Sequence, residues 1–299
     1  MVGFRPDDVG KIFGQDHLLD LLINWSEDLK QIPQSVLFAG PYGVGKTSIA
    51  RILASKLVSS KTDLKEINAA DARGIEDVRS WAESAKFSPL GAGGKVYIID
   101  ELHQMTTAAQ SALLKVIEEP PANIYFFLCT TEPFRLLPAI KSRCTVLELK
   151  LLGVQDTRRL LAFAFKGKFN NEILDAIHVK SGGHARDAVK MAEIAIMTNV
   201  VNVDDLSGKV GFGRSEIEGI FLNLFRNKVG LNQLQVLTSI QDSELVVQIM
   251  DYMLDMAVME GNEFVVRKFG ELINVRIAKR EHKINAGEQI LHFISAYLT

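Results

Sequence analysis

The sequence predicts an α/β domain with a parallel sheet, followed by two all-helical domains. Three observations support this fold class: short apolar runs alternate with helical patterns, a glycine-rich loop joins a strand to a helix, and strand-like runs mostly disappear after about residue 150. The apolar runs are short and continuous, as in strands buried on both faces, and they occupy residues 36–39, 96–99 and 124–129.

Helical patterns lie between these predicted strands. They occupy about 16–30, 46–58, 75–86 and 106–119. Pro120-Pro121 ends the last of them, since proline cannot continue a helix. Strands that alternate with helices favour a parallel sheet with both faces covered.

The rest of the chain has helical periodicity. Helices are predicted at 154–166, 171–181 and 185–198, with several more from about 215 to the end. The predicted domains are therefore an α/β domain at 1–150, a small helical lid at 151–205 and a helical collar at 206–299.

Composition excludes several classes of protein. The 299 residues have a net charge of −2, so a basic surface over the whole chain, as for general nucleic-acid binding, is not expected. The two cysteines, Cys129 and Cys144, form no C-x-x-C pair, so neither a disulfide framework nor a thiolate zinc site is expected. No apolar run approaches the length of a membrane span, and we expect a cytosolic protein with no membrane partner.

The strongest motif is a phosphate-binding loop that follows the first predicted strand. Its sequence, Gly40-Pro41-Tyr42-Gly43-Val44-Gly45-Lys46-Thr47, fits G-x-x-x-x-G-K-[ST] and opens a helix at Ser48. The glycines let backbone N–H groups point at phosphate, and the helix N-terminus adds positive potential. Lys46 is expected to reach the β/γ-phosphates of a nucleotide, and the Thr47 hydroxyl to bind Mg²⁺.

Acidic residues follow the second predicted strand. Asp100 and Glu101 come directly after Val96-Tyr97-Ile98-Ile99, at the carboxyl edge of the sheet, where ligands bind in open α/β folds. Asp100 is expected to hold Mg²⁺, and Glu101 to polarise an attacking water as general base. Taken alone, the pair also fits the acidic first residues of a helix that follows a strand. The phosphate loop upstream argues against that interpretation.

Three further residues are candidates. Thr130, past the third strand, can contact the γ-phosphate or simply form a turn. Arg143 can bond the C-terminus of its own helix or reach the nucleotide of a neighbouring subunit. Arg186 opens a helix in the predicted lid and can reach back to the nucleotide.

Together these stretches resemble the AAA+ clamp-loader ATPase subunits of the bacterial tau/gamma and replication factor C small-subunit type. The resemblance is dense over about residues 1–190 and thin beyond. It rests on the segments Arg5-Pro6, Phe13-Gly14-Gln15, 40–47, Ile98-Ile99-Asp100-Glu101, Ala112-Leu113-Leu114-Lys115, Glu118-Glu119-Pro120-Pro121, Thr130-Thr131, Pro138, Ser142-Arg143-Cys144, Gly183 and Arg186-Asp187-Ala188.

The resemblance implies roles for individual residues. Asp100 and Glu101 correspond to the Walker B pair, Thr130 to sensor 1, Arg143 to the trans-acting finger and Arg186 to sensor 2. Further contacts are implied for residues that the motifs alone do not assign: Ile12 and Gln15 in the adenine pocket, Arg73 and Arg79 on DNA, and Leu102 and Met105 on the sliding clamp. Leu102 and Met105 fit a core or lid role equally well.

The chain departs from the family pattern in three places. Between the phosphate loop and Walker B it has no cysteines, so the zinc module of the bacterial type is not expected, and the chain is more like a minimal phage or archaeal loader. Ala72 and Gly74 stand where the bacterial type tends to be basic, which predicts weaker or differently placed DNA contacts. The C-terminal third matches no family motif.

The resemblance implies an ATPase subunit that opens a DNA polymerase sliding clamp and places it on primer–template DNA. The expected cofactors are ATP and Mg²⁺, and the expected partners are other subunits of a pentameric ring, the clamp and DNA. Other AAA+ machines, such as a branch-migration helicase or an initiator loader, are alternatives. A scaffold subunit that binds nucleotide without hydrolysing it is a further alternative, and Lys46, Asp100 and Glu101 argue against it.

Overall fold

A computed structural model describes residues 4–203, 205 and 206. Within them the chain forms two compact units. The first runs to Leu174 and also contains Gly183–Lys190; the second contains Asp175–Gly182 and the residues from Met191 onward. The predicted collar, 206–299, lies outside the described residues except for Leu206, and the three-domain division stays a prediction.

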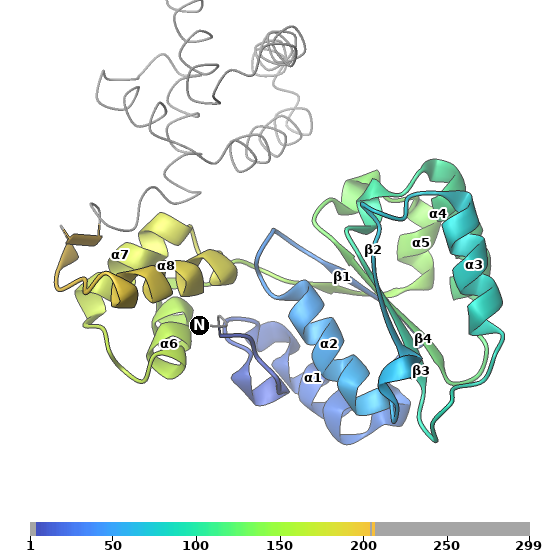
Figure 1. Ribbon diagram of the computed structural model, residues 1–299, viewed down its shortest axis with the longest axis horizontal. Coiled ribbons are helices and arrows are strands. Elements are labelled where there is room, and N and C mark those ends of the chain that lie inside the picture. The colour runs from blue at the N-terminus through green and yellow to red at the C-terminus, as the bar shows by residue number, and fades with distance from the viewer. Residues whose placement is uncertain (1–3, 204, 207–299) are drawn as a thin grey trace, which may run out of the picture. The chain divides into compact units, whose positions relative to one another are not determined.

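The first unit is built on a five-stranded parallel sheet (Figure 1). The strand order is β2-β3-β4-β1-β5, and every neighbouring pair is parallel. The strands are β1 (Ser35–Ala39), β2 (Leu64–Asn68), β3 (Lys95–Asp100), β4 (Ile124–Thr130) and β5 (Thr145–Glu148). The three predicted strands are confirmed as the central β1, β3 and β4, whereas β2 and β5, at the two edges, were not predicted.

Helices cover both faces of the sheet, and alternate residues of each strand supply two separate cores. On one face, Phe38 and Ile98 pack with Leu22 of α1 (Asp16–Glu27) and Leu53 of α2 (Lys46–Leu57). Figure 1 shows α1 and α2 on this face and a second layer of helices on the opposite face. These are α3 (Ile75–Ala85), α4 (Thr107–Glu118) and α5 (Pro138–Arg143).

The second core lies beneath α3, α4 and α5. Leu37 and Tyr97 turn to this face, where Leu113 of α4 and Ile140 of α5 cover them. Because side chains alternate along a strand, Leu37 and Phe38 belong to opposite cores. The helices predicted over 75–86 and 106–119 are confirmed.

Short 3-10 turns and the remaining helices complete the described chain. The turns are η1 (Val9–Lys11), η2 (Leu29–Gln31), η3 (Lys61–Asp63), η4 (Leu102–Gln104) and η5 (Pro133–Arg135). The helices are α6 (Val154–Ala164), α7 (Asn171–Ser181) and α8 (Ala185–Met197), as predicted. No helix in the described part of the chain is long and apolar enough to cross a membrane.

Candidate active site

The phosphate loop leaves β1 at the carboxyl edge of the sheet and enters α2. Its three glycines have positive φ angles: 147° at Gly40, 69° at Gly43 and 108° at Gly45. Gly45 is the N-cap of α2, and a Cβ atom built there would meet no atom within 4 Å. The positive φ angles thus let the loop curl at a helix N-terminus, with free space on the Cβ side of Gly45, and this is the geometry that suits phosphate.

Gly40 leaves no room for a side chain. A Cβ atom there would lie 2.3 Å from the backbone oxygen of Leu149, and its φ of 147° is one that other residues rarely adopt. Gly40→Ala is therefore expected to lower the free energy of unfolding by at least about 1–3 kcal/mol. Urea unfolding measures this loss. Gly153→Ala is the control, because its φ is −72° and its nearest contact would be 3.4 Å; an equal loss there would contradict the clash.

Lys46 is buried inside the loop. Its Nζ atom donates hydrogen bonds to the carbonyl oxygens of Gly40, at 2.8 Å, and Pro41, at 2.7 Å. Burial lowers the pKa of Lys46, while the nearby Glu101 and Asp100 oppose that shift. A cation that bonds two neutral carbonyls in an open glycine-rich loop is well suited to an incoming phosphate.

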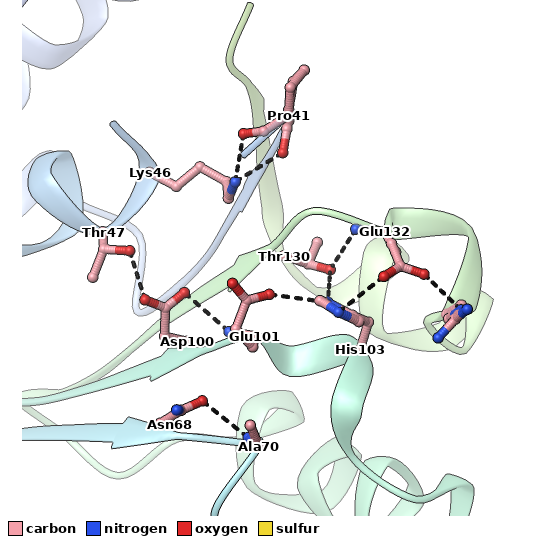
Figure 2. A network of polar contacts seen from close by, with 12 residues as sticks. Pro41, Lys46, Thr47, Asn68, Ala70, Asp100, Glu101, His103, Thr130 and Glu132 are labelled. Atoms are coloured by element: carbon pink, nitrogen blue, oxygen red, sulfur yellow. Dashed lines mark hydrogen bonds and ion pairs between the residues drawn. The ribbon is translucent and has the colours of Figure 1, made fainter. Parts of the chain in front are cut away.

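Figure 2 shows how α2 and β3 bring the predicted magnesium ligands together. The Thr47 hydroxyl donates to Oδ2 of Asp100 at 2.7 Å. Asp100 ends β3, and its Oδ1 accepts from the backbone N–H of Glu101 at 3.0 Å. Two side-chain oxygen atoms from separate elements thus lie beside the phosphate loop. Mg²⁺ binds such hard oxygen ligands.

Glu101 follows in a left-handed backbone conformation, with φ of 52°. Its side chain is 37% exposed. Burial raises the pKa of Glu101, and the negative charges of Asp100 and Glu132 also raise it, whereas His103 and Lys46 lower it. The strained backbone turns the carboxylate to the sheet edge beside Asp100, the place expected of a general base.

The end of β4 adds Thr130, which is fully buried. Its hydroxyl lies 3.2 Å from Nδ1 of His103 and accepts from the backbone N–H of Glu132 at 3.1 Å. The ring of His103 also lies beside Glu101 and Glu132, and Glu132 pairs with Arg135. Sequence reasoning did not assign a role in the site to His103, Glu132 or Arg135. The only signal for His103 was its place two residues after the acidic pair.

The start of α8 contacts the phosphate loop within the first unit. The backbone N–H of Arg186 donates to the carbonyl of Gly43 at 3.1 Å. Its guanidinium lies 4.9 Å from the ring centroid of Tyr42 and donates to the Tyr42 hydroxyl at 3.0 Å. His184 bonds the Tyr42 carbonyl at 2.7 Å. Arg186 is therefore beside the loop and stacks on Tyr42, and its contact with a nucleotide stays a prediction.

The residues predicted for the adenine pocket differ in accessibility. Ile12 packs against the first core and is half-buried. Gln15 is completely buried, and its amide bonds both the carbonyl, at 2.7 Å, and the N–H, at 3.0 Å, of Lys150. Both polar atoms of the Gln15 amide thus hold the segment after β5 in place, and the role of Ile12 and Gln15 in an adenine pocket stays a prediction.

Arg143 lies at the end of α5 and bonds its own protomer. Its guanidinium donates to Glu118 at 2.9 Å and to the carbonyl of Ala139 at 3.3 Å. The arginines predicted on DNA are exposed and have local partners: Arg73 bonds the carbonyl of Ala70, and Arg79 pairs with Glu76. The roles of these three arginines stay predictions.

Leu102 and Met105 are 0% and 4% exposed and belong to the core beneath α3, α4 and α5. A sliding-clamp contact through these two side chains is contradicted by their burial. Packing is the role that the sequence left open for them, and it agrees with their place in and directly after η4, among the residues of this core.

Comparisons with known proteins show what the chain as a whole is similar to. A family model described as DNA polymerase III, delta subunit, matches residues 60–153. The DNA polymerase III subunit tau of Salmonella typhimurium is 34% identical over 217 residues, which is 64% of this chain and 34% of that protein. Subunit tau of Bacillus subtilis is 32% identical over 237 residues, 68% of this chain and 40% of that protein.

For one shorter relative, the match covers a larger share of the relative's own length. Subunit gamma of Buchnera aphidicola is 31% identical over 225 residues, 67% of this chain and 62% of that protein. Among solved structures, the RuvB Holliday junction branch migration motor of Thermotoga maritima matches with a TM-score of 0.59 and 23% identity, covering 76% of this chain and 83% of that one. That likeness shows the fold alone.

Proposed function

We propose that this chain, an AAA+ relative of the tau and gamma subunits of DNA polymerase III, is the ATPase subunit of a sliding-clamp loader. Using ATP binding and hydrolysis, it would open the clamp and place it on primer–template DNA. One observation carries the proposal: a chain that is 31–34% identical to DNA polymerase III subunits over most of its length also has a phosphate loop with acidic partners beside it.

The loop and its neighbours fit ATP with Mg²⁺. Lys46 would bind the β/γ-phosphates, and the other loop residues, Gly40, Pro41, Gly43, Val44, Gly45 and Ser48, would surround them. Thr47 and Asp100, whose oxygens lie 2.7 Å apart, would hold Mg²⁺. The bound ion supplies charge stabilisation to the transferring phosphoryl group. Glu101 would polarise the attacking water.

Thr130 and Arg186 would report the γ-phosphate to the rest of the protein. Arg186 now bonds Tyr42, so a phosphate in the loop would compete with the tyrosine hydroxyl for its guanidinium. Because Arg186 opens α8, that exchange would connect nucleotide state to the helix. Nucleotide switches work in this way, because their contacts to the γ-phosphate are lost on hydrolysis.

The active assembly would be a pentameric ring in the cytoplasm. Arg143 of one subunit would complete the nucleotide site of the next, and residues 206–299 would form the collar that joins the subunits. Arg73 and Arg79 remain the candidates for the DNA surface. Any clamp contact would have to involve exposed residues, since Leu102 and Met105 are in the core.

Steady-state ATPase of the purified full chain tests the proposal. We expect ATP turnover to rise with primed DNA and to rise much further when the cognate clamp is added. The reason is that DNA and clamp both bind the arrangement of subunits that hydrolyses ATP. Glu101→Gln protein gives the background rate. Stimulation by DNA without any response to clamp would favour a helicase or initiator loader. Silence of the chain with its partner subunits present would favour a nucleotide-binding scaffold.

A further inference from the structure

We propose that His103 is a positioning residue that holds the Glu101 carboxylate and the Thr130 hydroxyl together at the edge of the sheet. Its side chain is 3% exposed. Its Nδ1 atom lies 3.2 Å from the Thr130 hydroxyl and 3.5 Å from Oε2 of Glu101. A single nitrogen atom thus faces two groups that ATP hydrolysis would use, so this inference deepens the proposed function and rests on it.

On the opposite side of the ring, the Nε2 atom lies beside a carboxylate that is itself paired with an arginine. The Nε2 atom of His103 lies 3.1 Å from Oε1 of Glu132, and the other oxygen of Glu132 lies 2.6 Å from Nε of Arg135. Figure 2 shows the resulting series of contacts, which runs from η5 through the imidazole to the end of β3. Each ring nitrogen thus has a polar neighbour, Oε1 of Glu132 beside Nε2 and the Thr130 hydroxyl beside Nδ1, and this pair of neighbours favours one orientation of the ring.

The hydrogen bonds are consistent in either protonation state of the ring. The Thr130 hydroxyl accepts from the backbone N–H of Glu132, which leaves its own proton to donate. In a neutral ring with the proton on Nε2, Nδ1 accepts that proton. In the doubly protonated ring, Nδ1–H would have the Thr130 oxygen at 3.2 Å and Oε2 of Glu101 at 3.5 Å as its neighbouring acceptors. In both states an Nε2–H would have Oε1 of Glu132 at 3.1 Å, so the same orientation of the ring serves both.

Glu101 needs such support because of its backbone. A φ of 52° is uncommon outside glycine, and the carboxylate stands on this strained residue at the sheet edge. A misplacement of about 1 Å in a reacting group can cost about 100-fold in rate. Loss of the Nδ1 contact is therefore expected to lower kcat by about 10–100-fold. Because His103 bonds no phosphate-loop residue, KM for ATP is expected to change less than about threefold.

A matched pair of variants separates positioning from packing. In His103→Asn, the side-chain amide places a donor near the Nδ1 position and loses the contact to Glu132; in His103→Gln, the amide reaches toward Glu132 and loses the Nδ1 contact. We expect the asparagine variant to retain more of the wild-type kcat than the glutamine variant, with similar KM and similar melting temperatures. Equal rates, or a more active glutamine variant, would overturn the proposal.

A second readout needs no hydrolysis. Nitrogen-15 imidazole spectra of the nucleotide-free full chain, with His103 assigned by its absence in His103→Gln, report each ring nitrogen separately. Glu101→Gln is expected to move the Nδ1 resonance of His103, and Glu132→Gln its Nε2 resonance. An Nδ1 resonance that ignores Glu101→Gln would overturn the proposal. If the wild-type chain hydrolyses no ATP, the proposed function fails and the spectra alone decide the role of His103.

Discussion

Replacing Glu101 by glutamine is expected to lower kcat for ATP about 10²–10⁴-fold while ATP binding is retained. Glutamine keeps the volume and the planar shape of the carboxylate but cannot take a proton, and general-base groups contribute rate factors of this size. The Glu101 carboxylate takes no part in the two hydrogen bonds described for Lys46, which donates to the carbonyls of Gly40 and Pro41. Single-turnover hydrolysis and ATP titration on the same preparation measure the two effects.

The control for this variant is Glu83→Gln. Glu83 is on the exposed face of α3 and pairs only with Lys86 among the ion pairs described for it, so its loss is expected to leave both measurements unchanged. Loss of ATP binding in Glu101→Gln, or a rate within a few-fold of wild type, would remove Glu101 from the role of general base.

Replacing Arg143 by alanine is expected to lower DNA- and clamp-stimulated turnover about 10³–10⁵-fold, the range for a finger that stabilises transition-state charge. Within its own chain Arg143 pairs with Glu118 and bonds the carbonyl of Ala139, so the variant loses one partly exposed ion pair and one exposed hydrogen bond and should keep its fold and its ATP affinity. Lys141→Ala, on the same helix α5, is the control and is expected to retain stimulated turnover.

A mixing experiment tests whether Arg143 acts on a neighbouring subunit. Arg143→Ala lacks the finger and Glu101→Gln lacks the base, so each is inactive alone. Where the two variants sit side by side in a ring, the finger of the Glu101→Gln subunit can complete the site of the Arg143→Ala subunit, and turnover should recover in part. A mixture as inactive as either variant would contradict action in trans between copies of this chain.

The sequence allowed the central strands to be predicted and not the edges, for a physical reason. The central strands β1, β3 and β4 are covered by helices on both faces, so they appear as continuous apolar runs. At the edges, β2 has the sequence Leu-Lys-Glu-Ile-Asn and β5 has Thr-Val-Leu-Glu, and both are largely solvent-accessible. Polar residues at a half-exposed edge make a strand hard to distinguish from a loop.

The candidate site was predictable where a local motif carries it. The loop at 40–47 and the acidic pair at 100–101 each declare their chemistry in a few consecutive residues. The imidazole of His103 lies beside Glu132 because β3 and β4 are neighbouring parallel strands, so the segments that follow them start at the same edge of the sheet. Gln15 and Lys150 are likewise 135 positions apart in the chain. Such contacts depend on tertiary structure that no short pattern contains.

The order of strands in the sheet also constrains how the protein is made. In space β1 lies between β4 and β5, with Ser35 paired to Phe126 and Val36 to Thr145. A nascent chain that ends before Ile124 leaves β1 with both edges unpaired, and exposed apolar edges invite aggregation. Closing such long loops is slow. Nucleotide affinity should therefore emerge late in synthesis, after the residues through β5 have left the ribosome, and nascent chains shorter than this are the natural clients of chaperones.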